Sequence, residues 1–382
     1  MGHQWRGFSR HFSGRGEATL RVLVLWADSR SANLGVQVLA YGMKELARRA
    51  WGSDVQVDFQ DYGRGDSDVA FGNRAIVADL GKRRGDLKVK LSSYDLIIDS
   101  GAGDSFADIY GAQRLLWMAN ANRLAASLNV PVVLGPQTIG PFNTWWGKAI
   151  GRYVMQRANQ VHSRDRASSD YVSELLGRRP DVSSTDVVFA LPVPNVSEKR
   201  DVLLNVSGLL WQENHHVDYE KYRRVIREII AEMTRNGRTV SLLSHVIESE
   251  SPDNDVPVCR ALADELNLEA LVPVDVTEAR RMVASAELVI GSRMHACLNA
   301  LSVGTRSLPL AYSRKFAPLM NDIGWSHVHD LRDEDLTVER IVAEAEELLR
   351  GEYDDELDAL RANAESRLSD SIEALKKISL TA

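Results

Sequence analysis

Residues 291–296, Gly-Ser-Arg-Met-His-Ala, combine side chains that suit both anion binding and proton transfer. Arg293 offers a planar guanidinium group that matches a phosphate or a carboxylate. His295 titrates near neutral pH and can act as a general acid or base. An apolar strand-like run precedes the segment, so a helix that begins here would also turn free backbone N–H groups towards an anion. The two side chains can act together if Arg293 still lies in the extended turn before that helix.

A purely structural role for this segment is an open alternative. In that interpretation, His295 caps or fills the start of the helix and Arg293 pairs with a surface carboxylate. Because the segment lies at the end of a strand and further cations follow other strands, we give the two interpretations equal weight.

Other polar residues also follow strand-like runs. In open α/β sheets, ligands bind beyond the carboxyl ends of the strands, so these positions define the candidate site. The positions that we select on this basis are Asn33, Gly35, Gly101, Gly103, Asp104, Asp108, Gln137, Thr138, Arg164, Asp165, Ser207, Gly208, Ser244, His245, Ser292, Arg293, His295, Ser313, Arg314 and Lys315.

The segment 101–111 is similar to a dinucleotide-binding loop but lacks its third glycine, because Phe106 stands at that position. Asp104 and Asp108 are spaced i, i+4 and would share one face of a helix. Two structural alternatives apply here. Asp104 could cap the helix, and Asp108 could be favoured near the helix start by the helix dipole.

Strand-like and helix-like runs alternate along the chain, which predicts parallel sheets. Helical patterns lie between the strands, most clearly from Tyr219 to Met233, where apolar residues recur on one face. We predict an α/β fold with two doubly wound Rossmann-like domains that face each other across a cleft. The expected strands cover residues 20–26, 94–99, 131–135, 160–163, 202–206, 239–243, 270–274, 288–291 and 307–312.

Changes in composition suggest where the domains begin and end. The stretch 191–200 contains two prolines and no periodic pattern, which is typical of a linker. The expected units are a flexible basic tail (1–19), an N-terminal domain (20–190), the linker (191–200), a C-terminal domain (201–350) and a helix that packs across the junction (351–382).

Composition excludes several classes of protein. Lys and Arg total 46 against 53 Asp and Glu, a net charge of -7, which disfavours a nucleic-acid partner. Cys259 and Cys297 lie in no CxxC pair, so neither a disulfide framework nor a zinc ribbon is expected, and no other metal motif stands out. No apolar run approaches the ~18 residues of a membrane-spanning helix. The tail lacks the apolar segment of a secretory signal, which favours a cytoplasmic location.

Five blocks of the sequence resemble, in order, the polysaccharide pyruvyl transferase family. The blocks begin at Ala32, Tyr94, Val132, Val161 and Leu288, and together they cover residues 20–330. The last block is the most specific, because it contains Arg-x-His at positions 293 and 295 and Tyr-Ser-x-Lys at positions 312–315.

The resemblance implies a two-domain fold like that of the glycosyltransferase B type. It also implies transfer of a pyruvyl group from phosphoenolpyruvate to a sugar, with formation of a cyclic ketal and release of phosphate. Within the family, the Arg-x-His pair is associated with phosphoenolpyruvate binding and catalysis, which carries over to Arg293 and His295.

The chemistry of phosphoenolpyruvate supports these roles, because its carboxylate and phosphate need cations to replace water. We expect Arg293, Arg164 and Lys315 to supply them. Our hypothesis makes His295 the general acid that protonates the methylene carbon and Asp104 the base for the sugar hydroxyl. The other predicted substrate-binding residues are Ser292, Asn33, Gly103, Asp108, Gln137 and Tyr312. No cofactor is expected besides phosphoenolpyruvate as co-substrate.

Two positions depart from the family pattern. Val36 replaces the usual Asp of the first block, which puts any role of an acid there in doubt. Gly140 stands where some relatives have a histidine, so the acceptor or the residue that serves it could differ.

Two other functions stay open: a nucleotide-sugar glycosyltransferase of the same fold, and a non-catalytic saccharide-binding relative. The acceptor sugar could be polymeric or lipid-linked. In the second case, Trp5 and Phe8 of the tail could touch the inner face of the membrane.

Overall fold

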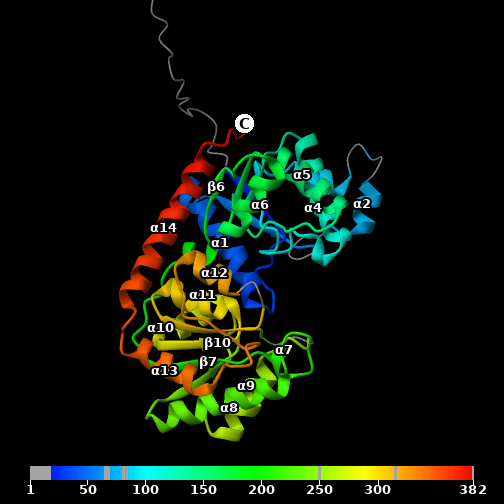
Figure 1. The fold of residues 1–382 in the computed structure, drawn as a ribbon. Coiled ribbons are helices and arrows are strands. Elements are labelled where there is room, and N and C mark those ends of the chain that lie inside the picture. The colour runs from blue at the N-terminus through cyan, green and yellow to red at the C-terminus, as the bar shows by residue number, and fades with distance from the viewer. Residues whose placement is uncertain are drawn as a thin grey trace, which may run out of the picture.

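The structure is a computed structural model that describes residues 19–63, 69–79, 82, 85–247, 251–313 and 316–380. The basic tail with Trp5 and Phe8 lies outside the described residues. The chain folds around two parallel six-stranded sheets, one in each lobe of Figure 1. The predicted pair of doubly wound α/β domains is therefore confirmed.

The first sheet has the strand order β2-β1-β3-β4-β5-β6, and all of its neighbouring pairs are parallel. Strands β3 and β4 are buried at every position, as expected for strands that helices cover on both faces. The strands are β1 (Arg21–Leu25), β2 (Gln56–Gln60), β3 (Leu96–Asp99), β4 (Val132–Gln137), β5 (Gln160–Ser163) and β6 (Val182–Ser183). The helices are α1 (Leu34–Trp51), α2 (Asn73–Asp79), α3 (Asp86–Leu91), α4 (Ala112–Ser127), α5 (Trp145–Arg157) and α6 (Arg166–Leu176), with a 3-10 turn η1 (Asp108–Tyr110).

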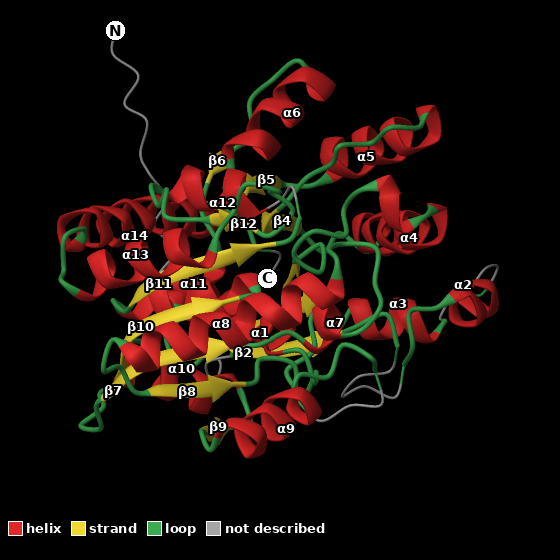
Figure 2. Cartoon of the chain, turned by 60° about the horizontal axis from the view of Figure 1, so that its bottom comes forward, coloured by secondary structure: helices red, strands yellow, loops and turns green. Residues whose placement is uncertain are grey.

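The second sheet has the order β12-β11-β10-β7-β8-β9, which in chain order is the 3-2-1-4-5-6 arrangement of dinucleotide-binding domains. Figure 2 shows its central strands side by side with helices around them. The strands are β7 (Arg200–Asn205), β8 (Val240–Leu243), β9 (Glu269–Leu271), β10 (Ala286–Gly291), β11 (Arg306–Ala311) and β12 (His329–Asp330). The helices are α7 (Gly208–Trp211), α8 (Tyr219–Arg235), α9 (Val256–Leu266), α10 (Val276–Ser285), α11 (Met294–Val303), α12 (Phe316–Ile323) and α13 (Val338–Leu349).

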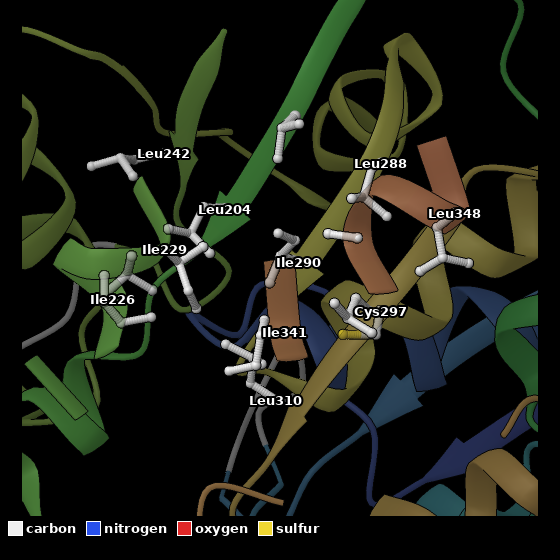
Figure 3. Packing of buried hydrophobic residues seen from close by; sticks show 14 of the residues in the cluster. Leu204, Ile226, Ile229, Leu242, Leu288, Ile290, Cys297, Leu310, Ile341 and Leu348 are labelled. Carbon is white, nitrogen blue, oxygen red and sulfur yellow. The ribbon is translucent and has the colours of Figure 1, made fainter. Parts of the chain in front are cut away.

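The core of the C-terminal domain lies between this sheet and helices α8, α11 and α13 (Figure 3). The apolar face predicted for α8 is the buried one, and it carries Ile226 and Ile229. These side chains belong to the same buried cluster as Leu204 of β7 and Leu242 of β8. Full burial of one such side chain stabilises the fold by ~1.5–3 kcal/mol.

Helix α14 (Asp354–Lys376) runs along both domains (Figure 1). Its first half buries Leu357 and Leu360 in the core of the C-terminal domain. Its second half buries Leu368 and Leu375 beside α1 and the first sheet. A single helix therefore contributes to the packing of both domains.

The connection between the domains contains a short ordered turn. Strand β6 ends at Ser183, the 3-10 turn η2 (Val187–Ala190) follows, and β7 begins at Arg200. The domain boundaries drawn from composition stay a prediction. Within the described part of the chain, no helix combines the length and apolar character needed to cross a bilayer.

Candidate functional site

The strand order reverses at one point in each sheet, and ligands of open α/β sheets bind at such points. In the first sheet the order reverses between β1 and β3, and in the second sheet it reverses between β7 and β10. Helices α1 and α11 begin at these two points. The two halves touch here, because Leu34 N–H at the start of α1 donates to the His245 carbonyl over 3.1 Å. Ile247 N–H likewise donates to the Ala32 carbonyl over 2.8 Å.

The Arg-x-His segment has the conformation that joint action requires. Arg293 is the N-cap of α11 and has an extended backbone (φ −101°, ψ 125°), and His295 lies in the first turn of the helix. Asn205 at the end of β7 fixes the segment, since its Oδ1 accepts the Arg293 N–H over 2.9 Å. Its carbonyl accepts the Ser292 N–H over 3.2 Å. Arg293 thus lies in the turn and not in the helix.

The Arg293 guanidinium forms an internal ion pair. Its Nη2 donates to Asp255 Oδ1 over 2.8 Å and to the Asp253 carbonyl over 2.6 Å. Asp255 is fully buried and also accepts the backbone N–H groups of Gly208 (2.7 Å) and Val246 (2.8 Å). The partner of Arg293 is therefore a buried carboxylate and not the surface carboxylate considered from the sequence.

His295 lies against the N-terminal domain, with its side chain 16% exposed. Its Nε2 is 3.7 Å from Asp186 Oδ2. On the other side of the ring, a Cβ built at Gly35 would stand 2.8 Å from His295 Nδ1. Only glycine at position 35 therefore allows the imidazole to approach α1 this closely.

Arg164, at the end of β5, points towards the same carboxylate. Its Nη1 donates to Asp186 Oδ2 over 3.0 Å, and its Nη2 donates to Thr138 Oγ1 over 2.6 Å. The buried Nε of Arg164 has no hydrogen-bond partner among the described residues. A Cβ at Gly103 would stand 3.7 Å from Arg164 Nη1, so the loop after β3 also borders this guanidinium.

His245, after β8, is a second histidine of this region. Burial, together with the charges of His295 and Arg293, lowers the pKa of His245 to about 3, so the ring is neutral. Its Nε2 lies 3.2 Å from Asn299 Nδ2, and the same amide donates to the His295 carbonyl over 2.7 Å. His245 is therefore a buried, neutral neighbour of the segment that carries His295.

The predicted helix that carries Asp104 and Asp108 is wrong. Gly101, Ala102 and Gly103 have positive φ angles of 56°, 48° and 80°, so the chain turns tightly and η1 begins only at Asp108. The two carboxylates therefore share no helical face.

Asp104 and Asp108 have separate partners. Asp104 Oδ2 accepts the Tyr110 hydroxyl over 2.9 Å. Asp108 Oδ2 accepts the backbone N–H and the hydroxyl of Thr144 over 2.6 and 2.7 Å at the start of α5. Burial alone would raise the pKa of Asp108, but the hydrogen bonds from this segment outweigh burial and lower it. Asp108 thus fixes the start of α5.

Gln137 and Asn33 lie in the N-terminal half of the junction. The buried Gln137 side chain donates from Nε2 to the Asp99 carbonyl over 2.9 Å, beneath the glycine turn. Asn33 is the N-cap of α1, because its Oδ1 accepts the Gly35 N–H over 2.9 Å. Both residues shape the loops around His295.

Ser292 and Tyr312 lie in the C-terminal half. Ser292 Oγ accepts the Tyr222 hydroxyl over 2.9 Å. Burial raises the pKa of Tyr312, although Arg293 opposes this effect. Lys315 lies outside the described residues. The structure therefore brings Arg164, Arg293 and His295 to one junction.

The sequence did not single out two central carboxylates. Asp186 follows β6, a strand of only two residues that gives no periodic signal. Asp255 precedes α9 and reaches Arg293 from a distant part of the chain. Thr138 and His245 follow predicted strands and were selected from the sequence on that basis.

Other concave regions lie away from His295. One depression of about 340 Å³ is lined mainly by α6 and β6 residues together with Arg367 of α14. It is wide and polar, and we regard the junction as the better candidate because it gathers buried charged groups from both domains. Within the described residues, no group of three or more His, Cys, Asp or Glu side chains is arranged to hold a metal ion.

Comparison with known proteins identifies the family of this chain. The model of the polysaccharide pyruvyl transferase family matches residues 33–314, which include both switch points. The chain belongs to the polysaccharide pyruvyl transferase family. The amylovoran biosynthesis protein AmsJ of Erwinia amylovora is 23% identical over 259 residues, which are 62% of this chain and 61% of that protein. The alignment thus spans less than two thirds of the relative.

Solved structures with a similar fold include two that contain UDP or a UDP-sugar. The UDP-GlcNAc 2-epimerase of Neisseria meningitidis, bound to UDP-GlcNAc, has a TM-score of 0.52 at 12% identity and covers 94% of this chain and 100% of its own. Anabaena Alr3699/HepE, in complex with UDP and glucose, has a TM-score of 0.53 at 11% identity with the same coverage. At these identities the likeness establishes the fold alone, and the fold is glycosyltransferase B-like.

Proposed function

We propose that this protein transfers the pyruvyl group of phosphoenolpyruvate to two hydroxyls of one sugar, with formation of a cyclic ketal and release of phosphate. The acceptor would belong to a polysaccharide or to its lipid-linked precursor. The observation that carries this proposal is the convergence of Arg164 with the Arg293-x-His295 turn at the domain junction of a pyruvyl transferase family member.

The charges at the junction suit a small dianionic metabolite. Arg164 Nε lacks a partner among the described residues and can donate to a bound anion. The Arg293 charge is largely offset by Asp255, so we assign it a smaller share of anion binding and a larger role in fixing the turn. Lys315 would add a third cation from the family's Tyr-Ser-x-Lys segment.

In the proposed reaction, His295 gives a proton to the methylene carbon of phosphoenolpyruvate, which makes C2 electrophilic. Oxygen of one sugar hydroxyl attacks C2 and loses its proton to a base, for which Asp104 is the candidate. The second hydroxyl then attacks C2 as the bond from C2 to the phosphate oxygen breaks. Its proton restores the imidazolium of His295, and the proton held by the base leaves with the phosphate. One ketal and one inorganic phosphate result for each phosphoenolpyruvate consumed.

The test is a screen of acceptor glycans with phosphoenolpyruvate as the donor. We expect one acceptor to gain the mass of one pyruvyl ketal, with one phosphate released for each ketal. A parallel reaction contains UDP-sugars, because the similar solved structures contain such ligands. Sugar transfer in that reaction, with no consumption of phosphoenolpyruvate, would replace our proposal by the nucleotide-sugar alternative.

A lipid-linked acceptor would place the enzyme at the cytoplasmic face of a membrane, with the basic tail as the contact. Anionic vesicles test this part of the proposal. We expect the full chain to sediment with vesicles that contain phosphatidylglycerol and a chain that lacks residues 1–18 to stay in solution. Equal sedimentation of the two proteins would contradict a role of the tail.

A further inference from the structure

Asp186 is a carboxylate at the junction to which the sequence assigned no role. It is fully buried and precedes η2 in the connection between the two domains. Its Oδ1 accepts the Val188 N–H over 2.9 Å, so one oxygen is fixed by the backbone. The other oxygen is thereby aimed at side chains from both domains.

Asp186 Oδ2 faces one cation and one imidazole. Arg164 Nη1 of the N-terminal domain donates to this oxygen over 3.0 Å. His295 Nε2 of the C-terminal domain lies 3.7 Å from it, within ion-pair range but too far for a good hydrogen bond. His295 Nε2 is buried and has no hydrogen-bond partner in the described part of the chain. A modest closure of the domains would complete this contact.

The negative charge of Asp186 persists in spite of burial. Burial alone would raise the pKa of this carboxyl, but the nearby His295 and the charge of Arg164 hold it well below its usual range. The other charged or titratable groups near His295 are Arg164, which pairs with the same Asp186 oxygen, Arg293, which Asp255 largely offsets, and His245, which is neutral. Asp186 is thus a buried negative charge that faces the His295 ring.

We propose that Asp186 is a positioning residue that holds the Nε2–H of His295 and keeps the imidazole protonated, so that Nδ1 is the atom that delivers the proton to the substrate. Nδ1 lies on the side of the ring next to Gly35, where the absence of a side chain leaves room for the imidazole. In the reaction proposed above, on which this inference rests, the proton leaves Nδ1 for the methylene carbon of phosphoenolpyruvate. The proton released by the second sugar hydroxyl then restores the imidazolium.

The first test follows the titration of the His295 ring by NMR in the enzyme without substrate. Its signal is identified as the one that His295→Ala lacks. In Asp186→Asn, we expect the midpoint of this titration to fall by about 1–3 pH units, the effect of losing an opposite charge at this distance. Asp275→Asn is the matched control, because Asp275 caps α10 through the Glu278 N–H and should leave the midpoint unchanged.

The second test uses activity. In Asp186→Asn, turnover should fall at neutral pH and the high-pH limb of the pH–rate profile should move to lower pH, whereas KM should change little. Asp186→Glu should recover part of the turnover. Asp186→Asn leaves the Arg164 charge buried and unpaired, which destabilises the protein. The double variant Asp186→Asn/Arg164→Gln removes both charges and replaces the single variant in the NMR test if that variant does not fold.

A midpoint unchanged in Asp186→Asn, or equal in the double variant and in Arg164→Gln, overturns the proposal. If the midpoint moves as expected but the wild-type protein consumes no phosphoenolpyruvate with any acceptor, the coupling of Asp186 to His295 stands and the proposed function fails. The NMR and activity results therefore separate the two claims.

Discussion

Arg293 and His295 lie two residues apart but face different surroundings. Arg293 is held by Asp255 inside the C-terminal domain, whereas His295 reaches towards Asp186 and Gly35 of the N-terminal half. The short Arg-x-His pattern therefore combines a residue that fixes the turn with one that lies at the junction of the two domains.

This difference predicts opposite outcomes for the two alanine variants. In His295→Ala, turnover should fall by ~10²–10⁴-fold, the usual contribution of a general acid, while the melting temperature stays the same. His215→Ala is the control, because that histidine is exposed in a loop. Unchanged turnover of His295→Ala in the ketal assay would remove His295 from the mechanism.

Arg293→Ala should lose stability as well as activity. Its removal leaves the fully buried Asp255 without its cation, which costs about 3–5 kcal/mol. Denaturant unfolding measures this loss, and Arg166→Ala is the comparison, because the Arg166 side chain is 85% exposed. Equal midpoints for the two variants would show that the ion pair with Asp255 contributes nothing.

The sequence identified candidate residues at strand ends but did not identify the side chains that pair with them. Arg164, Arg293 and His295 could be selected because each follows a buried apolar run. Asp186 and Asp255 could not, because a carboxylate becomes a partner only when the fold brings distant segments together, and no local pattern records that contact.

At the scale of elements, the nine predicted strands are all present, with ends shifted by a few residues. The strands that were missed are β2, which is largely polar and partly exposed, and β6 and β12, which have only two residues each. The turn at 101–103 was missed because an i, i+4 spacing suggested a helix, whereas the positive φ of Ala102 becomes evident only in the folded loop.

Helix α14 offers a prediction at this scale, because its second half packs into the N-terminal core. Leu368 is fully buried there, so Leu368→Ala should lower the free energy of unfolding by about 2–5 kcal/mol. Asp370→Ala, two residues further on an exposed face, should change it by less than about 0.5 kcal/mol. Similar losses in the two variants would mean that α14 does not pack as described.

At the scale of the whole molecule, acid should weaken the fold through buried neutral histidines. Burial lowers the pKa of His162 from 6.5 to about 4, although Asp181 opposes this shift. Between these values the unfolded chain binds a proton that the folded chain does not, so stability decreases as the pH falls through this window. From pH 7 to pH 4, the wild type should lose about 3 kcal/mol more than His162→Gln. Parallel stability curves for the two proteins would contradict this prediction.

The two domains place their switch points against each other, so neither sheet alone forms the site. Arg164 and Asp186 come from the first half of the chain, and Arg293 and His295 come from the second. The alternation of strands and helices was sufficient to predict two parallel sheets. The alternation could not predict the contacts between the two sheets, which depend on α1, η2 and α14.

The most direct measurement of the central claim is phosphate release from phosphoenolpyruvate in the presence of a matching acceptor glycan, compared between wild type and His295→Ala. We predict release in step with ketal formation by the wild type and a ~10²–10⁴-fold slower reaction in the folded variant. Equal rates for the two proteins, or no release by the wild type with any acceptor glycan, would contradict the account.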